Sequence, residues 1–75
     1  MSKVPRISGS EAVAAFERAG FSVDRVRGSH HIMKKSGHRY RLSIPVHSGK
    51  TVGVGLLGKQ IEAAGLSFDE FLNLL

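Results

Sequence analysis

This 75-residue chain lacks several features, and each absence excludes a class of protein. It has no cysteine, which excludes disulfides and thiolate metal sites. Its longest apolar runs are a few residues, far short of the ~20 that a membrane-spanning helix needs. The sequence also does not open with the charged and then apolar segments of a signal peptide. We therefore expect a soluble, cytoplasmic protein.

Acidic residues are missing from one segment, and this gap bears on function. Residues 29–50 carry five lysines and arginines and no aspartate or glutamate, whereas the whole chain has a net charge of +5. All four histidines lie in the same segment. A basic face that serves only solubility would normally have acids among its bases. The pattern instead favours a polyanionic partner such as a nucleic acid.

The residues that are present suffice for one small domain. A chain of this length can bury one hydrophobic core but not two. The hydrophobic content of 41% is typical of a folded protein. We therefore predict a single domain over residues 1–75.

Three helices are predicted, two of them from capping boxes. Ser8 and Glu11 have capping-box spacing, and apolar residues at helical spacing then predict a helix over 9–19. Ser67 and Glu70 have the same spacing and predict a short C-terminal helix. The apolar positions of the second and third helices are Leu56, Leu57, Ile61, Ala64, Phe68, Phe71, Leu72 and Leu75.

Three strands are predicted between the first two helices. Alternation with period two marks 21–27, 30–35 and 39–46, and in the first strand it falters at Arg25–Val26, which is compatible with a bulge. In the third strand the alternating sets are Tyr40, Leu42, Ile44 and Val46 against Arg39, Arg41, Ser43 and Pro45. This alternation predicts one buried face and one open, basic face, and a proline suits an edge strand.

The order of these elements predicts the fold class. Helix, three strands, helix and a short final helix should form an α+β two-layer sandwich with a three-stranded antiparallel sheet. The helices would cover one face of the sheet. The basic face would stay open to a ligand.

A glycine-rich stretch before and within the second helix imitates two nucleotide-binding motifs. Residues 53–59 contain both G-x-G-x-x-G and G-x-x-x-x-G-K. A dinucleotide site also needs an acidic residue about 20 residues further on, and the chain ends before that distance. A phosphate loop needs Ser or Thr after its lysine, but Gln60 follows Lys59. We therefore predict no nucleotide cofactor.

The histidines do not form a recognisable metal site. Their segment offers no cysteine or carboxylate to complete a zinc site. His30 and His31 are adjacent on a predicted strand, so they should point to opposite faces. The surrounding positive charge would also repel a dication. We predict no bound metal and no other cofactor.

Gly28-Ser29-His30-His31 is the most informative local sequence. On a strand, His31 shares a face with Met33, whereas His30 shares a face with Lys34. If Met33 is in the core, His31 is partly buried and structural, and His30 projects from the open basic face. There, an imidazole could move a proton while neighbouring cations neutralise phosphate charge. An exposed histidine is more often a plain surface residue, so the residues alone leave both interpretations open.

Several short motifs occur in a characteristic order along nearly the whole chain. They are Ala19-Gly20-Phe21, Arg25, Gly28-Ser29-His30-His31, Ile44-Pro45-Val46-His47, and Ala64-Gly65-Leu66-Ser67 with Phe71. In this order they resemble HicA, the small toxin of HicAB type II toxin–antitoxin systems, also called YcfA-like. The resemblance implies a double-stranded-RNA-binding-like fold. It also implies a ribosome-independent mRNA interferase, an endoribonuclease that a HicB antitoxin neutralises by covering its active histidine.

The resemblance further implies that His30 is the single catalytic histidine, supported by Gly28 and Ser29. The candidate RNA contacts in the basic segment are Lys34, Lys35, Arg39, Arg41, His47 and Lys50. Because carboxylate ligands are absent from this segment, we expect metal-independent cleavage that leaves a 2′,3′-cyclic phosphate and a 5′-hydroxyl. The alternative is a non-catalytic double-stranded-RNA-binding module in which His30 only forms a hydrogen bond.

Overall fold

The order of helices and strands agrees with the prediction. A computed structural model describes residues 4–75, and residues 1–3 lie outside the described part. The elements are α1 (Gly9–Arg18), β1 (Ser22–Arg27), β2 (His30–Lys34), β3 (Leu42–Pro45), α2 (Val54–Ala63) and α3 (Phe68–Leu72). The strands form one antiparallel sheet in the order β1-β2-β3. The predicted α+β class, with its α-β-β-β-α order and short final helix, is confirmed.

Both predicted capping boxes are present. The Ser8 hydroxyl accepts from the Glu11 backbone N–H at 3.1 Å, and the Glu11 carboxylate accepts from the Ser8 N–H at 3.1 Å. Ser67 and Glu70 make the same pair of bonds at 3.0 and 2.8 Å. Hydrogen bonds from Ser67 hold the pKa of Glu70 below its ordinary value. Two of the three helices therefore begin where the sequence predicts.

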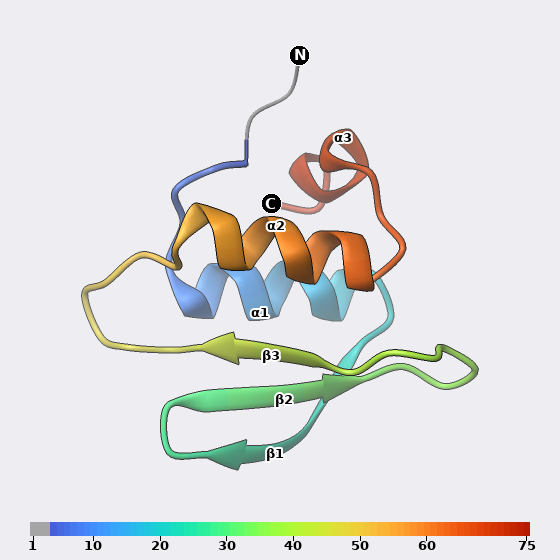
Figure 1. The fold of residues 1–75 in the computed structure, drawn as a ribbon, viewed down its shortest axis with the longest axis horizontal. Helices are drawn as coiled ribbons and strands as arrows, with labels where there is room; N and C mark the ends of the chain where they lie inside the picture. Colours follow the sequence, from blue (N-terminus) through green and yellow to red (C-terminus); the bar gives the residue numbers. More distant parts are fainter. Residues whose placement is uncertain (1–3) are drawn as a thin grey trace.

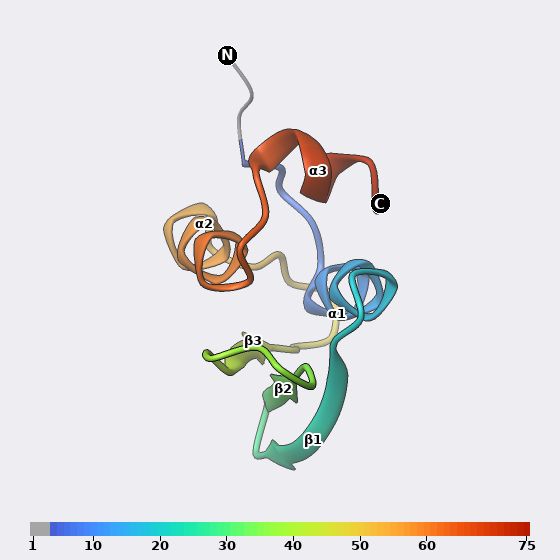
Figure 2. The ribbon, with the colours of Figure 1, turned by 90° about the vertical axis from the view of Figure 1, so that its right-hand side faces the viewer.

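The helices lie together on one side of the sheet, and β1 is the strand farthest from them (Figures 1 and 2). The Gln60 side chain of α2 accepts from the backbone N–H of Ser43 at 3.0 Å. This bond satisfies a donor on the outer edge of β3, an edge that would otherwise be open to another strand. The buried core comprises Ile7, Ala12, Ala15, Phe16, Phe21, Met33, Leu42, Ile44, Val52, Leu57, Ile61, Ala64 and Phe71.

The third strand is shorter than predicted. It covers Leu42–Pro45 instead of 39–46, although Leu42 and Ile44 are fully buried as expected and Pro45 lies on an edge strand. Tyr40, predicted on the buried face, is 55% exposed. The prediction for Tyr40 is therefore wrong.

A histidine in the connection between β2 and β3 explains the exposure of Tyr40. The ring of His38 packs edge-on against the buried Phe21, with centroids 5.3 Å apart. Its Nε2 lies 2.7 Å from the carbonyl oxygen of Ala63, at the end of α2. His38 therefore occupies the inner position, and the Tyr40 ring lies edge-on to it with centroids 6.3 Å apart.

The bulge in β1 lies one residue earlier than the sequence indicated. Val23 pairs with Met33 and Arg25 pairs with Ile32, so Asp24 is the extra residue of β1. Beyond a bulge the strand regains its alternation with the opposite parity. Arg25 therefore lies on the uncovered face of the sheet.

The apolar positions of the last two helices are only partly buried. Phe71 is fully buried, but Phe68 and Leu75 are exposed. Leu56, in the first turn of α2, is exposed too. Because α3 is only five residues long, it presents little more than one side chain to the core. Among residues 4–75 no helix is both long enough and apolar enough to cross a membrane.

Candidate active site on the open sheet face

A two-residue turn brings His30 to the first position of β2. Arg27 ends β1 and pairs with His30, which leaves Gly28 and Ser29 as the connection. Gly28 has φ +60° and Ser29 does not have a positive φ, the pattern of a type II′ hairpin turn. The backbone N–H of Val46 donates to the Ser29 carbonyl at 2.7 Å, so the turn is also tied to the chain after β3. Gly28 and Ser29 thus fix the backbone on which His30 stands.

The His30 imidazole lies on the open face with one nitrogen held. Its Nδ1 is 3.3 Å from the hydroxyl oxygen of Ser43, a long hydrogen bond across to β3. Within residues 4–75 no hydrogen bond engages Nε2, and the residue is exposed. A neutral imidazole anchored at one nitrogen can exchange a proton at the other. This arrangement suits acid–base chemistry on a ligand bound to the sheet.

His31 points to the opposite side, as predicted. It shares that side with Met33, which is fully buried, and is itself half-buried. Its Nδ1 is buried and has no hydrogen-bond partner. His31 therefore belongs to the helix-facing side of the sheet, away from the open face.

One carboxylate neutralises part of the basic face. Asp24 lies 2.7 Å from Nη1 of Arg41, 3.1 Å from Nζ of Lys34 and 3.8 Å from Nε of Arg25. Hydrogen bonds from Lys34 and Arg41 hold the pKa of Asp24 below its ordinary value, so it is ionised at neutral pH. The structure brings Lys34 and Arg41 together on the predicted face, but both are paired with a carboxylate.

The other predicted RNA contacts lie at the two ends of the sheet. Lys35 lies over the Phe21 ring at 5.7 Å and Arg39 over the Tyr40 ring at 5.9 Å, both beyond the end of β2 that is distant from His30. His47 and Lys50 are exposed in the connection after β3, at the end of the sheet where the Gly28-Ser29 turn lies. The six predicted contacts therefore do not form one cluster.

The sequence analysis did not select three residues on the same face as His30. Ser43 holds its imidazole, Asp24 pairs with two of the cations, and Arg27 lies directly opposite it in the sheet. The position of Arg27 has a sequence signal, because residues that flank a two-residue hairpin turn always pair. Asp24 has no such signal in the sequence, because its position depends on the bulge in β1.

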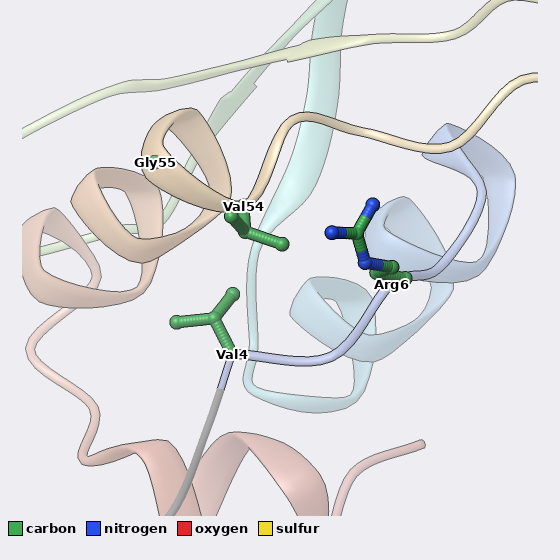
Figure 3. Close-up of a pocket in the computed structure, with 4 residues that line it drawn as sticks. All are labelled: Val4, Arg6, Val54 and Gly55. Carbon is green, nitrogen blue, oxygen red and sulfur yellow. The ribbon is translucent and has the colours of Figure 1, made fainter.

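The candidate site is an open surface, and no metal cluster is evident near it. Among residues 4–75 no group of three or more His, Cys, Asp or Glu side chains is arranged to hold a metal ion. A hollow is found elsewhere, between the N-terminal segment and the start of α2, where Val4, Arg6, Val54 and Gly55 line it (Figure 3). The hollow lies apart from the open face that carries His30.

A comparison with protein families identifies the family of this chain. The family described as the HicA toxin of bacterial toxin–antitoxin systems matches residues 9–66, from the first residue of α1 to just beyond α2. No curated protein matches the sequence significantly. The matched segment covers most of the chain and contains the whole sheet with the turn that carries His30. The chain therefore belongs to the HicA toxin family of toxin–antitoxin systems.

Proposed function

We propose that this toxin is a metal-independent endoribonuclease, a ribosome-independent mRNA interferase that uses His30 as its general acid/base. The observation that carries the proposal is the His30 ring itself: exposed, anchored at Nδ1 by Ser43, and free at Nε2 among residues 4–75. It stands on a sheet face that lysines and arginines dominate. A proton-transferring group among phosphate-binding cations is what cleavage of RNA requires.

The RNA substrate supplies its own nucleophile. His30 Nε2 removes the proton from a 2′-hydroxyl, the 2′-oxygen bonds to the adjacent phosphorus, and the bond from phosphorus to the 5′-oxygen breaks. His30 then donates the proton that it took up to the departing 5′-oxygen. The imidazole thus ends in its starting state, and the products carry a 2′,3′-cyclic phosphate and a 5′-hydroxyl.

Ser43 suits both stages of this reaction. Nδ1 keeps its proton while Nε2 gains and loses one, so the Ser43 hydroxyl can accept a hydrogen bond from Nδ1 in both stages. The Ser43 backbone is itself held by Gln60 of α2. The ring can therefore keep its orientation while Nε2 gains and loses the proton.

The antitoxin partner of the system is proposed to act on the same face. A HicB-type protein that covers His30 would block access of mRNA in the cytoplasm, where both occur. To complement this face it would have to present carboxylates to the exposed cations. Toxin and antitoxin would then recognise each other partly through the charges that bind RNA.

Cleavage of a defined single-stranded RNA in the presence of EDTA tests the proposal. The wild type should cleave it, and His30→Ala should lose activity by at least about 100-fold, the usual contribution of a general acid/base. Because His30 is exposed, the variant should keep the wild-type melting temperature. Equal cleavage by both proteins would contradict the role of His30. A shift of the RNA on a gel without cleavage by either protein would favour the binding module.

A further inference from the structure

An arginine that the sequence analysis did not select lies beside His30. In the β1–β2 pairing, Arg27 is directly opposite His30. Opposed residues of an antiparallel pair project from the same face, with Cβ atoms about 4.5–5.5 Å apart. Both residues are exposed. A guanidinium is therefore within reach of a group that the His30 imidazole contacts.

Arg27 differs from Lys34, Arg41 and Arg25 in having no carboxylate partner among the described residues. Lys34, Arg41 and Arg25 all surround the Asp24 carboxylate. Within residues 4–75 no ion pair, hydrogen bond or ring contact engages the Arg27 side chain. A phosphate that approaches Arg27 does not have to displace a carboxylate first.

The chemistry of RNA cleavage needs a cation at this place. As the 2′-oxygen bonds to phosphorus, negative charge increases on the two oxygens that do not bridge nucleotides. A guanidinium presents a planar fork of N–H donors that matches two phosphate oxygens. Because Arg27 stands on a strand whose pairing with β2 fixes its backbone, its guanidinium can reach a phosphate beside His30, where this charge would develop.

We propose that Arg27 is a second catalytic residue, which binds the non-bridging oxygens of the phosphate that the 2′-oxygen attacks. The inference rests on the proposed function and adds a residue to it. Arg27 stays protonated throughout, and the proton moves only between the 2′-oxygen, His30 and the 5′-oxygen. Its contribution is therefore to the rate of the chemical step more than to the affinity for RNA.

Three variants test this role. Arg27→Ala removes the guanidinium, Arg27→Lys keeps the charge but not the fork, and Arg6→Ala is the matched control. Arg6 is also an exposed arginine, but it lies on the N-terminal segment beside the hollow in Figure 3. Each variant is measured for its single-turnover rate with protein in saturating excess over RNA. Its affinity is measured on an RNA whose 2′-hydroxyls are methylated and cannot attack.

The expected pattern separates catalysis from binding. Arg27→Ala should slow the saturated rate by about 100-fold or more, as the loss of a charge-stabilising donor does in other enzymes. Its affinity should fall only several-fold, and Arg27→Lys should have an intermediate rate. Arg6→Ala should keep the wild-type rate. Because Arg27 is exposed, the variants should have melting temperatures similar to that of the wild type. If Arg27→Ala does not fold, the rate of Arg27→Lys is compared with that of the wild type instead.

Other outcomes overturn the inference in distinguishable ways. If Arg27→Ala and Arg6→Ala cleave equally fast while His30→Ala is inactive, Arg27 is not catalytic and the proposed function stands. If Arg27→Ala weakens binding but keeps the saturated rate, Arg27 is a binding contact only, and the inference is again overturned. If the wild type does not cleave, or His30→Ala cleaves like the wild type, the proposed function fails and the inference fails with it.

Discussion

Asp24 alters how the charge of this chain is distributed over its surface. The sequence places no acid between residues 29 and 50, yet the bulge in β1 brings Asp24 to two cations of that segment. Lys34 and Arg41 are on the face where they were predicted. A phosphate must nevertheless compete with a carboxylate to reach them. Net charge along a sequence therefore overstates the binding capacity of this part of the sheet.

Removal of that carboxylate should strengthen RNA binding. Asp24→Asn keeps the shape of the side chain but releases Lys34 and Arg41 for phosphates. We expect affinity for the methylated RNA to rise several-fold, with the salt dependence steepened by about 0.7 for each added phosphate contact. Dissociation constants at several salt concentrations measure both effects.

A second acid controls for the change of net charge. Glu17, exposed on α1, can be replaced by glutamine with the same loss of one negative charge. If Asp24→Asn and Glu17→Gln change the affinity and the salt slope equally, Asp24 does not restrain the two cations.

Residue orientation was predictable wherever a buried neighbour fixed it. Met33 is in the core, so alternation alone assigns His31 to the inner side and His30 to the open face. The partners of the open-face residues were not predictable in the same way. The Asp24 interactions join residues from β1, from β2 and from just before β3, and depend on one extra residue in β1.

At the scale of the elements, α1 and β3 meet at an unusually close contact. A Cβ built on Gly9, the first residue of α1, would collide with the carbonyl oxygen of Pro45 and lie 2.8 Å from Cα of Val46. Pro45 is the β3 partner of His30. This contact therefore holds α1 close to the end of the sheet that carries the candidate site.

Two glycine-to-alanine changes should have opposite effects on stability. Gly9→Ala should destabilise the fold by about 1–3 kcal/mol, because helix and strand must move apart. Gly58→Ala, inside α2, meets only a Val4 methyl at 3.5 Å and should raise stability by up to about 1 kcal/mol through helix propensity. Chemical denaturation of both variants measures the difference. Equal stabilities would show that the close contact does not constrain the fold.

The sequence predicted elements best where the signal was local. The capping boxes at Ser8 and Ser67 and the alternation at Leu42 and Ile44 depend on neighbours in the chain, and all are present. Tyr40 continues the same alternation but is exposed. The packing of the His38 ring against a distant phenylalanine and its hydrogen bond to the end of α2 take the inner position instead. Contacts between distant elements have no such local pattern.

At the scale of the whole molecule, the side that stabilises the fold is separate from the side proposed to act on RNA. The helices lie together on one side of the sheet (Figure 2), where the core is, and His30 shares the uncovered face with Lys34. Substitutions at His30 or Arg27 should therefore affect activity with little effect on folding. Because the proposed RNA site and antitoxin site share this uncovered face, their binding should be mutually exclusive.

The chemical identity of the cleaved ends tests the central claim most directly. We would incubate the purified chain with a defined single-stranded RNA in EDTA and analyse the new termini by mass spectrometry. Acid–base catalysis by His30 on the 2′-hydroxyl predicts a 2′,3′-cyclic phosphate on one fragment and a 5′-hydroxyl on the other. A 3′-hydroxyl with a 5′-phosphate, or cleavage that EDTA abolishes, would contradict it.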